Sequence, residues 1–154
     1  MSLFIMVDLL RTNSDNPDFK KLVLLLDQDL RIRDGDDHAF YAQFNKIDKI
    51  NHVVIAFNDD IAVGCGAIKQ YADGVMEVKR MFVKPEARGK GIASKILFEL
   101  EIWAKELGNL SCILETGFQQ PEAIALYHKS GYIRTENYGQ YAGIENSACF
   151  IKSI

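Results

Sequence analysis

Residues 78–93 read VKRMFVKPEARGKGIA, and this stretch decides the fold. Its first half reads as the end of a β-strand, which Pro85 stops because proline has no N–H to donate to a neighbouring strand. Gly89 and Gly91 follow, and glycine adopts backbone conformations closed to other residues and lets a ligand approach the main chain closely. The stretch therefore predicts a strand, a tight turn and a helix that begins near Ile92.

The helix after the turn is predicted from apolar residues at helical spacing and from Gly108, which suits the position just past a helix end. These apolar residues are Ile92, Ile96, Leu100, Trp103 and Leu107. Free amides at the helix start, the helix dipole and the cations of Arg88 and Lys90 together favour a di- or polyphosphate. The alternative is a strand, turn and helix without a ligand, and the glycine spacing matches neither the Rossmann nor the P-loop motif.

The strand before the turn is expected to alternate regularly between its two faces. One face would then carry Val75, Glu77, Lys79, Met81 and Val83. The other face would carry Met76, Val78, Arg80 and Phe82. A regular alternation therefore puts Glu77 and Met81 on the same face.

Hydrophobic patterns predict the remaining helices and strands. The expected helices begin at Pro17 and end near residues 33–35, span residues 37–47, and run from Pro121 to near Gly131. The expected strands cover residues 3–10, 52–57, 61–70, 111–115, 132–134 and 148–152. Short turns make the strands from residue 52 to residue 83 antiparallel neighbours. The long helix that follows allows the strand over residues 111–115 to lie parallel to the strand that ends at residue 83.

The turn and a later segment together resemble the Gcn5-related N-acetyltransferase family. Residues 88–93, RGKGIA, resemble the Q/R-x-x-G-x-G/A signature with which that family binds the pyrophosphate of acetyl-coenzyme A (acetyl-CoA). Residues 123–127, AIALY, followed by Gly131 and Tyr132, resemble the second cofactor element of the family. The resemblance implies an α/β (α+β) fold with one domain over residues 1–154. Its mixed, mostly antiparallel central sheet would have about six to seven strands flanked by about four helices.

The resemblance also implies acetyl-CoA as the cosubstrate. The coenzyme-binding residues that it implies are Met81, Phe82, Val83, Arg88, Gly89, Lys90, Gly91, Ile92, Ala93, Thr116, Gln120, Ala123 and Tyr127. Some relatives carry an asparagine early in the second element, where this chain reads TGFQQPE over residues 116–122. Thr116 or Gln120 replaces that contact, or else these residues finish a strand or cap a helix.

Two residues are implied for the chemistry. A lysine-like amine has a pKa of about 10.4, so removing its proton near pH 7 costs roughly 4–5 kcal/mol. Glu77 resembles the general base of several family members, acting through water, and Tyr127 resembles the tyrosine that protonates the departing thiolate. The structural alternatives are an ion pair of Glu77 with Lys79 or Arg80, and a Tyr127 ring packed on the sheet.

The acceptor site is expected where the family places it, beside the connection between the first two helices. Charged residues in this connection are Arg31, Arg33, Asp36, Asp37 and His38. Tyr138 and Tyr141 lie in residues 136–149, a segment that shapes the acceptor cleft or a dimer contact. We take Arg31, Arg33, Asp37, Tyr138 and Tyr141 as candidate acceptor residues, the alternative being a solvated loop.

The composition excludes several classes of protein. With 154 residues, 48% hydrophobic and 25% charged, the chain fits one globular domain, and its net charge of −3 argues against a general nucleic-acid binder. No run approaches the roughly 20 apolar residues of a membrane span. The three cysteines are widely spaced and odd in number, which indicates reduced core residues of a cytoplasmic protein. The histidines lack the spacing of metal ligands, so we expect no metal.

We therefore predict an acetyl-CoA-dependent N-acetyltransferase. It would transfer an acetyl group to a primary amine of a small molecule, amino acid or peptide by direct attack in a ternary complex. The alternatives are a non-catalytic coenzyme-binding sensor, a protein N-terminal acetyltransferase, and transfer of another acyl group. A homodimer is a further possibility, because the apolar C-terminal strand offers an edge.

Overall fold

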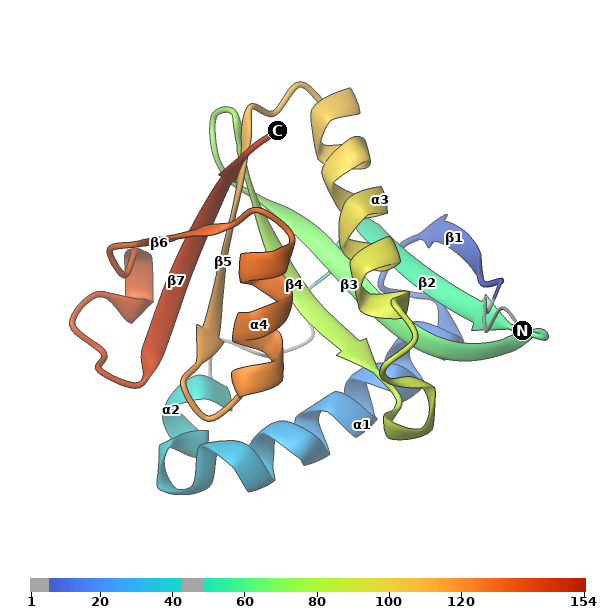
Figure 1. Ribbon diagram of the computed structural model, residues 1–154, viewed down its shortest axis with the longest axis horizontal. Coiled ribbons are helices and arrows are strands. Elements are labelled where there is room, and N and C mark those ends of the chain that lie inside the picture. Colours follow the sequence, from blue (N-terminus) through green and yellow to red (C-terminus); the bar gives the residue numbers. More distant parts are fainter. Residues whose placement is uncertain (1–5, 43–48) are drawn as a thin grey trace.

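The computed structural model describes residues 6–42 and 49–154, and in this part of the chain it shows a mixed seven-stranded sheet (Figure 1). The strands are β1 (Asp8–Thr12), β2 (His52–Asn58), β3 (Ile61–Ala72), β4 (Val75–Val83), β5 (Ser111–Gly117), β6 (Ile133–Thr135) and β7 (Ser147–Ser153). Their order is β1-β2-β3-β4-β5-β7-β6, with β4 and β5 parallel and the other neighbours antiparallel. The predicted sheet, including its parallel step, is confirmed.

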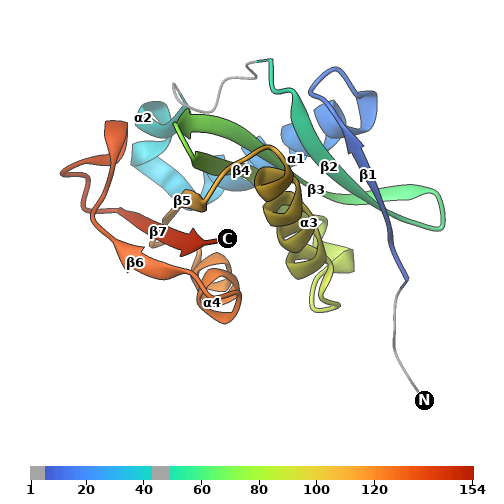
Figure 2. The same cartoon turned by 90° about the horizontal axis from the view of Figure 1, so that it is seen from above.

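Helices cover both faces of this sheet, as Figure 2 shows. The α-helices of the described residues are α1 (Pro17–Asp34), α2 (His38–Ala42), α3 (Ile92–Glu106) and α4 (Pro121–Lys129), and the short 3-10 helices are η1 (Gly35–Asp37), η2 (Pro85–Ala87) and η3 (Gly139–Tyr141). α1 buries Phe19, Leu22 and Val23 against one face of the sheet, whereas α3 and α4 pack on the other. The α/β class and the number of helices agree with the prediction.

Boundaries near the N-terminus differ from the prediction. β1 begins at Asp8, because its extent is set by pairing with β2 from Asp8 opposite Phe57 to Thr12 opposite Val53. Residues 3–5 of the strand predicted over 3–10 lie outside the described residues. α1 begins at Pro17 as predicted, since the side chain of Asn16 accepts hydrogen bonds from the amides of the first turn. The helix predicted over 37–47 begins at His38, and its continuation at 43–48 lies outside the described part.

A bulge in β4 overturns the predicted alternation of its side chains. Cys65 of β3 lies opposite Phe82 and Ala67 lies opposite Lys79, so two residues of β4 face one residue of β3. Arg80, one of these two, has a φ of 60°. Phe82 therefore packs in the core beneath α1, whereas Met81 packs against the core beneath α3. Glu77 and Met81 do not share a strand face, because the inserted residue shifts the alternation.

The same bulge accompanies a parting of β4 from β5. The two strands pair only over Val75–Glu77 with Ser111–Ile113, and beyond these residues their paths diverge (Figure 1). The main chain of the second half of β4 therefore has no strand neighbour on the β5 side. A sheet opening of this kind offers unpaired N–H and C=O groups to a ligand.

The interior of the protein has the reduced cysteines that the sequence predicted. Cys65, Cys112 and Cys149 are all buried and free. Within residues 6–42 and 49–154, none of the helices combines the length and the apolar composition that a bilayer span requires.

Candidate active site

A loop between β4 and α3 forms an anion cradle. It passes through η2 to Gly89 and Gly91, each with a φ of 78°, a backbone conformation that favours glycine. Gly91 is the N-cap of α3 and offers no side-chain cap, so the first amides of the helix stay available to a ligand. Nothing lies within 4 Å of an ideal Cβ at either glycine, so backbone conformation rather than crowding requires them.

A cavity of about 460 Å³ extends from this cradle along the opening between β4 and α4. It brings together most of the predicted coenzyme residues: Met81, Phe82, Val83, Arg88, Gly89, Gly91, Ile92, Ala93, Gln120, Ala123 and Tyr127. Lys90 is an exposed residue of the cradle loop that does not line this cavity. Thr116 lines the neighbouring cavity instead. The long cavity with amides at one end fits an extended ligand that carries phosphates.

A second cavity, of about 100 Å³, adjoins the first where the strands part. Leu26, Met81, Gln120 and Tyr127 line both. The second cavity is also lined by polar side chains that the first lacks, which include Asp34, Tyr41, Glu77, Lys79, Glu115 and Tyr141. Two substrates that enter from opposite ends would therefore meet beside Met81 and Tyr127.

Glu77, the predicted base, lies in this second cavity with both carboxylate oxygens engaged. The hydroxyl of Tyr138 donates to Oε2 at 2.6 Å, and Lys79 Nζ lies 3.8 Å from Oε1. Burial and the carboxylate of Glu77 raise the pKa of Tyr138, so this tyrosine remains a hydrogen-bond donor at neutral pH. The predicted contact with Lys79 is thus present, together with one from Tyr138.

Glu115 is a second carboxyl group in the same cavity, and the sequence reasoning missed it. Its Oε2 is buried and has no hydrogen-bond partner among the described residues. Burial raises the pKa of Glu115, and the nearby Asp34 and Glu77 also raise it, whereas a hydrogen bond with Ser147 and the charge of Lys79 lower it; the net pKa is about 7. A carboxyl group with this pKa exchanges a proton readily near neutral pH.

Tyr127 of α4 stands between the two cavities. Its side chain is buried, with its ring 5.8 Å from the ring of Tyr132 and 6.1 Å from that of Phe150. Burial and then the charge of Glu115 raise the pKa of Tyr127, so the phenol keeps its proton at neutral pH. The ring of Tyr127 is therefore packed against its neighbours, as the structural alternative from the sequence proposed, and its hydroxyl also keeps a proton that it can donate.

The predicted acceptor residues occupy different places. Tyr141 lines the second cavity, and Tyr138 contacts it through Glu77. Arg33 pairs with Asp29 and Glu122, Asp37 accepts a hydrogen bond from Asn146, and Arg31 is exposed; none of these three lines either cavity. Asp36 is also exposed, and the side chain of His38 lies outside the described part of the chain.

A signal for Glu115 was present in the sequence. A carboxylate follows the apolar run Cys112–Leu114 directly, and a charged residue at the end of a buried strand is costly unless it has a function or a partner. Tyr41 and Ser147 gave no such signal, because their contact at 2.9 Å joins residues 106 positions apart.

An anion cradle, a parted sheet and two adjoining cavities form one continuous site that is suited to a phosphate-bearing ligand and a second, smaller ligand. The chain belongs to the acetyltransferase (GNAT) family, whose model matches residues 19–132. The resemblance of the cradle motif to that family is thereby confirmed. Among the described residues, no group of three or more histidine, cysteine or carboxylate side chains is placed to hold a metal ion.

Individual relatives agree with this membership. An IAA acetyltransferase of Azospirillum brasilense is 42% identical over 89 residues, which cover 57% of this chain and 58% of that protein, under two thirds of its length. A structure from Klebsiella pneumoniae described as an acyl-CoA N-acyltransferase has a TM-score of 0.81 at 25% identity, covering 97% of this chain and 98% of that one. The PaiA N-acetyltransferase of Thermoplasma acidophilum, solved with coenzyme A, has a TM-score of 0.70 at 18% identity, covering 97% and 99%.

Proposed function

We propose that the protein is an N-acetyltransferase that uses acetyl-CoA to acetylate a primary amine of a small molecule, amino acid or peptide. The observation that carries the proposal is the junction of the two cavities at Met81, Gln120 and Tyr127. The longer cavity ends at the amides of the cradle and takes the coenzyme, and the shorter, acidic one takes the amine. Coenzyme A bound in the PaiA structure supports this choice of cosubstrate.

The cradle holds the coenzyme by its pyrophosphate. The amides that follow Gly91 and the guanidinium of Arg88 provide hydrogen bonds and positive charge. The unpaired edge of β4 beyond the bulge offers its main chain to the amides of the pantetheine arm, and its N–H groups polarise the thioester carbonyl. The thioester then lies beside Tyr127.

Proton transfer is assigned to the acidic cavity. The acceptor enters as an ammonium ion, which the carboxylates of Glu77 and Glu115 attract, and it must lose a proton before its nitrogen attacks the thioester carbon. Glu115 accepts this proton, because its Oε2 has no hydrogen-bond partner among the described residues. Glu77 acts on the same proton through water or holds the ammonium ion, since Tyr138 and Lys79 already engage its oxygens.

The leaving group completes the cycle. When the tetrahedral intermediate breaks its carbon–sulfur bond, the departing thiolate takes a proton from the hydroxyl of Tyr127. The products are the acetylated amine and coenzyme A. The second proton of the amine passes through the carboxylates to the phenolate of Tyr127, which regains its proton, and the proton that Glu115 accepted leaves to solvent. No cysteine nucleophile is needed, and the buried Cys65, Cys112 and Cys149 fit that reading.

Thermal unfolding with and without acetyl-CoA tests the cosubstrate before the acceptor is known. Ligand at about a hundred times its Kd stabilises a protein by roughly 2.7 kcal/mol, which shifts Tm by several degrees. The shift should disappear in a variant with Arg88→Ala and Gly91→Trp. A shift in the wild type justifies a screen of amines for thiol release, and no shift at millimolar acetyl-CoA would refute the proposal.

A further inference from the structure

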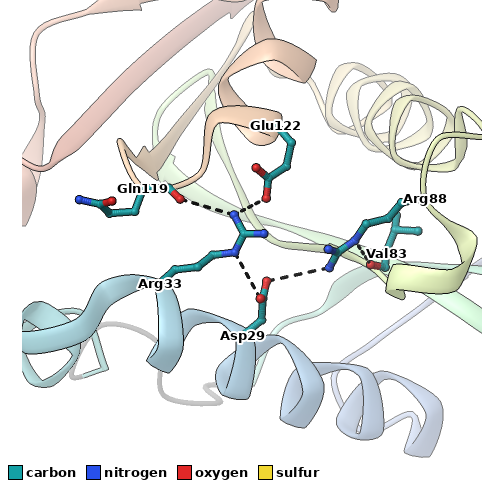
Figure 3. A network of polar contacts seen from close by, with 6 residues as sticks. All are labelled: Asp29, Arg33, Val83, Arg88, Gln119 and Glu122. Carbon is teal, nitrogen blue, oxygen red and sulfur yellow. Dashed lines mark hydrogen bonds and ion pairs between the residues drawn. The ribbon is translucent and has the colours of Figure 1, made fainter.

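A network of ion pairs spans the opening of the sheet, and Figure 3 shows it from close by. Arg33, in the last turn of α1, lies between two carboxylates. Its Nε is 3.2 Å from Oδ1 of Asp29, one turn earlier on α1, and its Nη1 contacts Oε1 of Glu122 in the first turn of α4. The same Nη1 donates to the carbonyl oxygen of Gln119 at 3.5 Å.

These contacts join two helices on opposite faces of the sheet. α1 packs on one face and α4 on the other, so strands normally separate such helices. Where β4 and β5 part, no strand pairing fills the space between them, and Arg33 reaches from α1 to the start of α4. Arg33 is therefore a bridge between the two sides of the opening.

The bridge also reaches the coenzyme cradle. Oδ2 of Asp29 lies 3.9 Å from Nη2 of Arg88, whose Nε donates to the carbonyl oxygen of Val83 at 2.8 Å. One carboxylate thus connects Arg33 with the cradle arginine, as the two arginines in Figure 3 show. Asp29, Arg88 and Glu122 all line the coenzyme cavity.

We propose that Arg33 is a positioning residue for the coenzyme, which fixes the start of α4 against α1 and so sets the width of the coenzyme cavity. Gln120, Ala123 and Tyr127 follow the residues that Arg33 contacts and line that cavity directly. The inference rests on the proposed function to the extent that this cavity takes the coenzyme. It changes the role expected for Arg33 from the sequence, which was contact with the acceptor.

The energetics favour a network rather than a single pair. Glu122 is 54% exposed and Arg33 is 22% exposed, so one such pair alone contributes little. Arg33 instead makes three contacts with a planar guanidinium, and lysine cannot reproduce this geometry with one nitrogen. Loss of Arg33 frees the start of α4, so coenzyme affinity should fall by about threefold to tenfold.

A double-mutant cycle on coenzyme A binding tests the proposal. Coenzyme A is titrated by calorimetry into the wild type, Arg33→Ala, Glu122→Ala and the double variant. Arg33→Ala should weaken Kd by about threefold to tenfold and Glu122→Ala by less, because the Glu122 contact is one of the three that Arg33 makes. The double variant should lose little more than Arg33→Ala, because the effect of Glu122 passes through Arg33. Lys21→Ala, which removes an exposed cation from the same helix, is the matched control and should bind as the wild type does.

Steady-state kinetics separate positioning from a general loss of structure. In Arg33→Ala the KM for acetyl-CoA should rise while the KM for the acceptor stays constant. High salt screens the ion pairs, so it should lower the coenzyme affinity of the wild type towards that of the variant. An unchanged Kd, additive losses in the double variant, or a rise confined to the acceptor KM would overturn the inference. If the wild type binds coenzyme A but Arg33→Ala binds it equally well, the positioning role fails while the proposed function stands. If the wild type binds none, both fail.

Discussion

Replacing Glu115 by glutamine should make the protein more stable at neutral pH and less active. Glu115 lies in the acidic cavity with a buried, unpaired Oε2, and burial raises its pKa from 4.5 to about 7. Glutamine has nearly the shape of a protonated carboxyl group but cannot ionise. The variant therefore removes the cost of a buried charge and, with it, the proton acceptor that we propose for the reaction.

The magnitude follows from the pKa of Glu115. Below about pH 4.5 the carboxyl group is protonated in both folded and unfolded chains, so wild type and variant should have similar free energies of unfolding. Above that pH the unfolded chain ionises first, and the wild type loses stability relative to the variant until the pH passes about 7. The full difference is about 3 kcal/mol in favour of Glu115→Gln, at roughly 1.4 kcal/mol for each unit of pKa.

Urea unfolding at a series of pH values from 4 to 8 would measure this difference. The gap between the two proteins should open between pH 4.5 and 7 and stay constant at higher pH. Glu145→Gln, which removes an exposed carboxylate that lines neither of the two cavities, is the control and should show no such step near pH 7. A gap that does not change with pH, or a variant less stable than the wild type at pH 8, would refute the assignment of Glu115 as a buried, strained carboxyl group.

Four further predictions concern the site and the sheet beside it. Tyr127→Phe should lower kcat about a hundredfold with little change in Tm, since a general acid contributes about that much or more; an unchanged kcat would remove Tyr127 from the mechanism. Wild-type kcat/KM should rise with pH through about 7, because Glu115 must be unprotonated to accept a proton, and this step should be absent from Glu115→Gln. Gly66→Ala should cost about 1–3 kcal/mol of unfolding free energy, because the new Cβ would lie 2.5 Å from Met81 Sδ and 2.8 Å from Leu100 Cδ1. Gly91→Ala should cost only about 1 kcal/mol, from its left-handed backbone alone; denaturation midpoints that reverse this order would contradict both estimates.

The sequence predicted those parts of the molecule whose cause is local. Proline and glycine end β4 and open the cradle, and the helical spacing from Ile92 onwards is visible in any window of the sequence. The cradle motif and residues 123–127, which resemble a second cofactor element, also lie within short stretches. Both could therefore be located to the residue before any tertiary contact was known.

The remaining features depend on contacts between distant segments. The bulge at Arg80 lies where the pairing register of β4 with β3 shifts by one residue, and nothing in the local composition of β4 indicates that shift. The raised pKa of Glu115 comes first from burial and then from Asp34 and Glu77, which approach it from two other elements. The Arg33 bridge likewise joins residues 89 positions apart, since its partner is Glu122.

The bulge has a further consequence for how the specificity of this protein can change. Glu77, Val78 and Lys79, which precede the bulge in β4, line only the acidic cavity where we propose that the amine binds, whereas Phe82 and Val83 after it line only the proposed coenzyme cavity. Substitutions at Glu77 or Lys79 can therefore alter acceptor preference while the coenzyme contacts stay intact. The inserted residue thus divides β4 into two parts whose substitutions affect different cavities. A directed-evolution library confined to Glu77 and Lys79 should yield variants that accept new amines while their affinity for the coenzyme stays constant.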